Sequence, residues 1–115
     1  MKENFLIDKS IAFASRIIKL NQYLVRTKKE AVISRQIVRS GTSIGANVAE
    51  SQQAQSRADF ISKLNIALKE TAETDYWLRL LHATEYLNDQ EFQSVFDDCN
   101  EIGKMLTAIL KSTKK

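Results

Sequence analysis

The feature that most limits how this chain can fold is the absence of proline from all 115 residues, with glycine present only three times. Tight turns between β-strands rely on both residue types, and proline breaks the interior of a helix. Long helices are therefore favoured over a series of hairpins. Residues 1–115 are expected to form a single domain, since this length suits one hydrophobic core.

Apolar residues recur at helical spacing from about Asp8 to Arg26, which predicts the first helix. Two apolar seams run side by side along this segment, and together they predict a broad buried face. The first seam contains Ile7, Ile11, Ala14, Ile18 and Val25, and the second contains Phe13, Ile17, Leu20 and Leu24.

The second helix is expected to open with a capping box, in which Thr27 and Glu30 bond each other's backbone amides, and to end near Gln53. Gly41 and Gly45 fall inside it. Each interior glycine costs roughly 1 kcal/mol relative to alanine, which indicates a close backbone approach or a local bend. The apolar seam of this helix contains Ile33, Ile37, Ile44 and Val48.

Two further helices have recognisable start signals. Ser56 is an expected N-cap for the third helix, and Asn88 with Glu91 forms a capping box for the fourth, where Leu87 is placed to pack on Phe92. Four helices of about 20 residues with short connections predict an all-α protein, an antiparallel up-down-up-down four-helix bundle. The expected core residues are Phe60, Leu64, Ala67, Thr71, Leu78 and Leu81 in the third helix, and Val95, Phe96, Cys99, Ile102, Leu106, Ile109 and Leu110 in the fourth.

The third helix carries a second apolar set on roughly the opposite side from its core seam. A helix that is apolar on two faces needs two packing partners. We therefore expect this set to form an oligomer interface between copies of the chain. It contains Ile66, Tyr76, Trp77 and Leu80.

Several polar residues lie close to the apolar seams of the second and third helices. A buried carboxylate must be paired or hydrogen-bonded, and Arg35, Arg39 and Arg79 are candidate partners. We favour a polar network between helices or subunits over a ligand site. The network residues are Asn47, Glu50, Glu70, Glu73 and Asp75.

The chain lacks the residue set of a metal or nucleophilic enzyme. A di-iron bundle needs two Glu-x-x-His motifs, but His82 is the one histidine and the residue three before it is Arg79. Cys99 falls on a core seam, where cysteine acts as a small buried hydrophobe. We expect no enzyme activity, no catalytic residues, no metal and no cofactor.

Cys99 is also the only cysteine, so an intrachain disulfide is impossible and a reducing compartment is expected. No apolar run approaches the ~20 residues of a membrane span, and the first residues do not resemble a signal peptide. The sequence therefore predicts a cytoplasmic protein with no membrane partner.

The positive charge of the chain is concentrated in its first half. Residues 1–57 hold ten Lys/Arg and four Asp/Glu, whereas residues 58–115 hold seven and ten. Four cations of the first helix fall within about 100° of arc with Tyr23 among them, a pattern that suits a phosphate backbone with occasional base stacking. An ordinary solvated face is the alternative. The stripe contains Lys9, Arg16, Lys19 and Arg26, and Arg35 and Arg39 of the second helix are further candidate nucleic-acid-binding residues.

The segment Gln36–Ser51 resembles the signature of the bacterial four-helix-bundle family first noticed in intervening sequences of large-subunit ribosomal RNA genes, Ser-Ile-Pro-x-Asn-Ile-Ala-Glu-Gly. Ser43, Ile44, Asn47, Ala49 and Glu50 match this pattern, whereas Gly45 replaces the proline and Ser51 the final glycine. Residues 59–61, 67–78 and 101–106 resemble later parts of the same family. The resemblance covers nearly the whole chain.

The resemblance implies a four-helix bundle that assembles as a ring-shaped homopentamer. A related protein, the accessory protein of diversity-generating retroelements, binds a reverse transcriptase and nucleic acid, whereas most members have no known activity. Our first hypothesis is a non-enzymatic homo-oligomer that binds RNA, DNA or a nucleic-acid-processing protein through basic residues of the first two helices. The alternative is a protein–protein interaction scaffold that does not bind nucleic acid.

Overall fold

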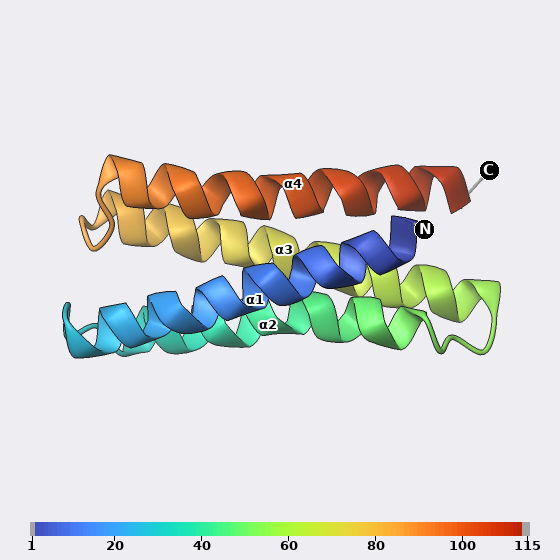
Figure 1. The fold of residues 1–115 in the computed structure, drawn as a ribbon, viewed down its shortest axis with the longest axis horizontal. Helices are drawn as coiled ribbons and strands as arrows, with labels where there is room; N and C mark the ends of the chain where they lie inside the picture. Colours follow the sequence, from blue (N-terminus) through green and yellow to red (C-terminus); the bar gives the residue numbers. More distant parts are fainter. Residues whose placement is uncertain (1, 114–115) are drawn as a thin grey trace.

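The described residues form four antiparallel helices (Figure 1). The structure, a computed structural model, describes the backbone of residues 2–113 and the side chains of residues 5–113. Short connections reverse the chain after each helix, which gives the predicted up-down-up-down four-helix bundle with extents of 44 × 21 × 19 Å. No helix in the described part of the chain is apolar over the length needed to cross a lipid bilayer. The helices are α1 (Lys2–Arg26), α2 (Val32–Ser51), α3 (Arg57–Ala83) and α4 (Asp89–Thr113).

The core is built from the apolar seams predicted for α2, α3 and α4. Burying each leucine or isoleucine side chain stabilises the fold by roughly 1.5–3 kcal/mol. Phe60, Ile33 and Ile109 flank this core and are half-buried. Phe96 was predicted in the core but is half-buried outside it, where its ring stacks on Phe92. The fully or almost fully buried members include Ile37, Ile44, Val48, Leu64, Ala67, Leu78, Leu81, Cys99, Ile102 and Leu106.

The prediction for the first helix was wrong about one of its two seams. Phe13, Ile17 and Leu24 are buried, but three residues of the other seam face outward: Ile11, Ile18 and Val25 are 58%, 45% and 40% exposed. Ile7 and Ala14 of that seam are half-buried. Helical periodicity cannot choose between two parallel seams, because both have the same spacing. α1 also begins six residues earlier than predicted, at Lys2, which places Leu6 in the core at 1% exposure.

The start of α2 also differs from the prediction. α1 continues to Arg26, Lys29 adopts a left-handed conformation with φ of 59°, and α2 begins only at Val32. The buried Glu30 carboxylate accepts hydrogen bonds from the amides of Val32, Ile33 and Ser34 at 3.0, 2.9 and 2.8 Å. Glu30 therefore caps α2 alone, whereas the amide of Thr27 completes the last turn of α1 by donating to the Tyr23 carbonyl.

The other helix boundaries follow the sequence signals closely. Ser56 Oγ accepts from the Asp59 amide at 3.0 Å, as expected of an N-cap. Asn88 and Glu91 exchange hydrogen bonds between side chain and amide, both at 2.8 Å, so the capping box of α4 is confirmed. α2 ends at Ser51, two residues before the predicted end at Gln53.

The two glycines of α2 permit a close approach to α1, one of the two possibilities that the sequence left open. A methyl group added at Gly41 would lie 3.0 Å from Cγ1 and Cγ2 of Ile17, and one added at Gly45 would lie 3.0 Å from Oγ of Ser10. These distances are shorter than ordinary contacts between carbon atoms. α1 consequently packs much more extensively on α2 than on α4.

Glu30→Ala should lower the free energy of unfolding by roughly 1–2 kcal/mol, because three amides at the start of α2 lose a charged acceptor. Thr27→Ala is the matched control and should change it by less than about 0.5 kcal/mol, since Thr27 is exposed and caps no helix. Urea unfolding followed by circular dichroism measures both. Equal losses of stability in the two variants would instead support the Thr27–Glu30 capping box predicted from the sequence.

Gly41→Ala and Gly103→Ala make the same chemical change in two helices. At Gly103 the new methyl group meets only Thr71 Cγ2 at 3.5 Å, so the variant should gain up to about 1 kcal/mol of helix stability. At Gly41 the clash with Ile17 should cancel this gain, leaving the variant roughly 1–2 kcal/mol less stable than Gly103→Ala. Equal stabilisation in urea unfolding would show that α1 moves away without cost.

Candidate functional site

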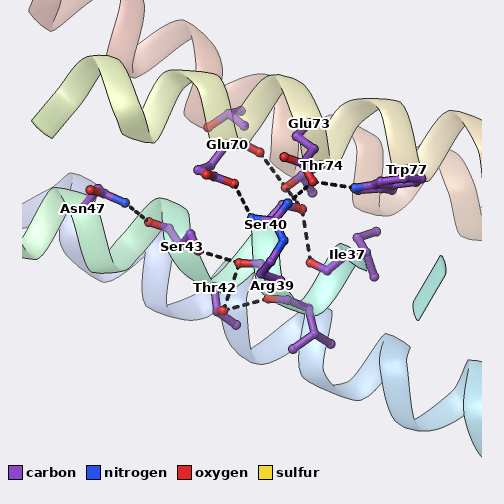
Figure 2. A network of polar contacts seen from close by, with 12 residues as sticks. Ile37, Arg39, Ser40, Thr42, Ser43, Asn47, Glu70, Glu73, Thr74 and Trp77 are labelled. Carbon is purple, nitrogen blue, oxygen red and sulfur yellow. Dashed lines mark hydrogen bonds and ion pairs between the residues drawn. The ribbon is translucent and has the colours of Figure 1, made fainter. Parts of the chain in front are cut away.

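The signature segment of α2 is joined to α3 by buried hydroxyl groups (Figure 2). The hydroxyls of Ser40 and Thr74 lie 2.9 Å apart, and both side chains are completely buried. Thr74 Oγ1 is also 2.8 Å from the Glu70 carbonyl of its own helix. Because buried polar groups need partners, this pair fixes the register of α2 on α3.

Arg39 extends the same connection toward the surface. Its guanidinium forms ion pairs with Glu70, at 3.3 Å, and with Glu73. Glu73 Oε2 also accepts a hydrogen bond of 3.0 Å from the Trp77 indole, as Figure 2 shows. The hydrogen bond from Arg39, and then that from Trp77, lowers the pKa of Glu73 below its ordinary value. Arg39 is thus engaged with α3, although its side chain remains 49% exposed.

Other polar residues of the signature bond their own helix or a neighbour. Asn47 Nδ2 donates to the Ser43 carbonyl at 2.9 Å, and Ser43 Oγ donates to the Arg39 carbonyl. Glu50 pairs with Lys63 of α3 at 3.0 Å, a partner that the sequence did not reveal because 13 residues and a turn separate the two. The bonds of Asn47 and Ser43 thus lie within α2, whereas the pair formed by Glu50 joins α2 to α3.

Asp75 and Arg35 were also candidates for the polar network, but neither forms an ion pair with another helix within residues 5–113. Asp75 pairs with Arg79 one turn further along α3, not with another helix. Arg35 is exposed and forms no ion pair with the described side chains of residues 5–113. Of the three arginines proposed as partners, Arg39 alone pairs with carboxylates of another helix, whereas Arg79 lies over the Phe96 ring of α4, 5.0 Å from its centroid.

Two of the four cations in the basic stripe of α1 pair with carboxylates of α4. Lys9 pairs with Glu101, which raises the pKa of the lysine, and Arg16 pairs with Asp98 at 2.8 Å. Arg16 also donates to the Ser94 carbonyl at 3.2 Å. These two cations connect α1 to α4 across the weakest helix contact of the bundle.

The other cations of the stripe are exposed near the turn between α1 and α2. No ion pair involves them within residues 5–113. Lys28 lies 5.9 Å from the centroid of the Tyr23 ring and extends the same positive region. The run Arg26-Thr27-Lys28-Lys29 is the sequence signal that could have added both turn lysines. We call Lys19, Arg26, Lys28, Lys29 and Arg35 the basic end.

A second surface is formed by the outward seam of α1. Ser10 and Ile17 of α1 contact the glycines of α2, so Ile11 and Ile18, each about 100° further round, lie outside that contact. In α2, Thr42 and Ala46 each lie about 100° further round the helix than Gly41 and Gly45. This rotation places them on the side of α2 away from Ser40 and α3. The resulting surface carries few charges. We call it the α1–α2 face; it contains Ile11, Ile18 and Val25 of α1 and Val38, Thr42, Ala46 and Ala49 of α2.

The apolar set predicted as an interface on α3 is only partly exposed. Ile66 and Tyr76 are 38% and 56% exposed, whereas Trp77 and Leu80 are half-buried. Trp77 packs edge-on against the Tyr76 ring at 5.0 Å and touches the core. Sequence reasoning assigned the whole unpartnered apolar surface to α3 and missed the larger share on α1.

The residues considered for catalysis have structural partners. Burial raises the pKa of the Cys99 thiol to about 12, and its Sγ lies 3.6 Å from the Thr71 carbonyl. His82 is 2.7 Å from Asp89 and stacks on Phe92, with the ring centroids 4.2 Å apart. Within residues 5–113, no three His, Cys, Asp or Glu side chains are grouped closely enough to hold a metal. A shallow groove of about 490 Å³ between α3 and α4 has Cys99 in its lining, but a thiol with this pKa is a poor nucleophile.

Comparison with protein families shows that residues 2–108 match the family described as 23S rRNA-intervening sequence protein. Among solved structures, a protein of unknown function from the S23 ribosomal protein family of Bacteroides thetaiotaomicron is similar, with a TM-score of 0.95. The two are 58% identical over 96% of this chain and 99% of that chain. Among curated proteins none matches. The family match spans nearly all of the sequence, and the chain belongs to the 23S rRNA-intervening sequence protein family.

Proposed function

We propose that this chain is a non-enzymatic, self-associating helical bundle of the cytoplasm, and that the α1–α2 face is one of its subunit contacts. The observation that carries the proposal is the row formed by Ile11, Ile18 and Val25, which repeat every seven residues and are 40–58% exposed. Single exposed apolar side chains are normal on protein surfaces, but a contiguous apolar patch marks an interaction site.

The partner that suits this face best is another copy of the chain. The partly exposed apolar set on α3 lies on a different side of the bundle, so one copy can offer the α1–α2 face to the α3 set of the next. Contacts between unlike faces generate closed rings when the rotation between copies closes. A ring of five copies agrees with the assembly implied by the family resemblance.

Nucleic-acid binding is a second candidate function, favoured by the basic end. Arg26, Lys28 and Lys29 lie at the turn between α1 and α2, while Lys19 and Arg35 lie in the helices on either side of it. None of the five is engaged in an ion pair with a described carboxylate. Such a cluster attracts phosphates and releases condensed counterions when they bind. Lys9, Arg16 and Arg39 contribute less to this candidate than their sequence positions suggested, because each is already paired.

Ile18→Glu tests the subunit contact. The wild-type chain should scatter light as an assembly several times heavier than 13.1 kDa, and the variant should dissociate toward the monomer because burying an unpaired carboxylate is costly. Tyr76→Glu should act in the same way from the α3 set. Ala12→Glu is the control, since Ala12 is exposed on α1 about 100° away from Ile11.

A wild-type monomer, or dissociation by Ala12→Glu as readily as by Ile18→Glu, would contradict the proposed contact. Circular dichroism should show unchanged helicity in all three variants, because each substitution replaces an exposed side chain. This check separates dissociation from unfolding.

Charge reversal tests the nucleic-acid candidate. Lys19→Glu with Arg26→Glu should weaken binding of a structured RNA by at least about tenfold at low salt, since phosphate contacts and counterion release are lost together. Lys69→Glu with Lys104→Glu is the control, because it makes the same change in net charge at exposed lysines outside the basic end. Filter binding across a salt series measures both pairs. Absence of binding at low salt, or equal loss in the two pairs, would exclude the basic end as the site.

A further inference from the structure

A cleft of about 330 Å³ opens between α1 and α4, beside the basic end. Leu20 and Tyr23 of α1 line it together with Leu87 and with Val95 of α4. Leu87 and Val95 are buried, whereas Leu20 and Tyr23 are half-buried, so the floor is apolar but reachable from solvent. Small-molecule sites are typically apolar hollows of roughly 300–1,000 Å³ with a few polar groups.

The positively and negatively charged side chains of this cleft lie on opposite sides of it. Arg16 and Lys19 line the α1 side, and Glu91 lines the α4 side. Arg16 is held in place by Asp98, at 2.8 Å, while Glu91 is held by its hydrogen bond from the Asn88 amide. An anionic group entering the cleft must therefore lie along α1, whereas hydrogen-bond donors suit the side of Glu91.

Tyr23 supplies an aromatic surface between these groups. Its backbone belongs to the last turns of α1, where the Thr27 and Lys28 amides bond the Tyr23 carbonyl and fix the helix end. Lys28 Nζ lies 5.9 Å from the ring centroid, which brings a further cation to the edge of the cleft. An aromatic ring, an apolar floor and adjacent cations are the components that bind unstacked bases in single-strand-binding proteins.

We propose that the cleft binds one unpaired nucleotide, with its base stacked on Tyr23 and its phosphate beside Lys19, the cation of the cleft that has no carboxylate partner among residues 5–113. The inference rests on the proposed nucleic-acid function and specifies which form of nucleic acid is bound. A base inside a duplex is stacked on both sides and cannot enter such a cleft, whereas a base in a single strand or loop can. The cleft lies between α1 and α4, so it stays accessible when the α1–α2 face is covered by another copy.

Fluorescence anisotropy with a labelled 12-nucleotide RNA strand tests the cleft, using the full-length chain, a duplex of the same sequence and a strand of abasic residues. The single strand should bind most tightly. Tyr23→Leu should weaken its binding by roughly 5- to 150-fold without changing the salt dependence, because stacking is lost but phosphate contacts remain. Tyr23→Phe should retain binding, and Phe5→Leu is the control at an exposed aromatic outside the cleft.

Lys19→Gln gives an independent readout at an exposed residue, so it does not depend on the tolerance of the half-buried Tyr23. It should lower the slope of log affinity against log salt by about 0.7, the value of one phosphate contact to a single strand. Competition by a free nucleoside monophosphate would show that the nucleotide alone suffices for binding. Competition by RNA strands alone would show that the site needs a polymer. Either result supports the cleft if the competed binding is lost in Tyr23→Leu.

Two other results would overturn the proposed nucleotide site, and they differ in whether nucleic-acid binding by the basic end is also excluded. Equal binding of single strand, duplex and abasic strand, unaffected by Tyr23→Leu, would overturn the cleft but keep the basic end. Absence of RNA binding by the wild-type chain at low salt would overturn both.

Discussion

The close approach of α1 to α2 at Gly41 and Gly45 is the contact on which the rest of this bundle depends. It lets Ile17 and Ser10 lie directly against the α2 backbone at the two glycines. The contact of α1 with α4 is much less extensive. Two pairs of long side chains, Lys9 with Glu101 and Arg16 with Asp98, join these two helices, and a cleft remains between them.

This geometry gives α1 three separate surfaces. Phe13, Ile17 and Leu24 fill the core, the row beginning at Ile11 forms part of the α1–α2 face, and Tyr23 lines the cleft toward α4. The proposed subunit contact and the proposed nucleotide site therefore lie on different sides of one helix. Surface ion pairs contribute only about 0.2–1 kcal/mol each, so the pairs between α1 and α4 add little to the apolar packing of the core.

The sequence was sufficient to predict the bundle, its topology and most of its core, because the seams of α2 and α4 are single and the caps of α3 and α4 are local. It was not sufficient where two solutions have the same periodicity or where a contact crosses helices. Ile18 and Ile17 are equivalent in hydrophobicity, and only packing decides which is buried. Likewise, nothing in the spacing of Arg16 predicts Asp98 as its partner, 82 residues away. The basic stripe was visible in the sequence, but its division into paired and unpaired cations needed the positions of α3 and α4.

The buried positions of α2 have a consequence for how this protein tolerates change. Four of its seven buried residues are small, namely Ser34, Ser40, Gly41 and Ser51, and the serine hydroxyls are satisfied by backbone carbonyls or by Thr74. Substitution at such positions almost always adds volume, so the usual damage in α2 is steric overlap. In α4, where Ile102 and Leu106 fill the same core, most substitutions remove volume and leave cavities. A cavity loses apolar contacts that the surroundings restore only in part, whereas overlap must be relieved by movement of the facing side chain, such as Ile17, or of its helix. The same core is therefore damaged by crowding from α2 and by loss of packing from α4.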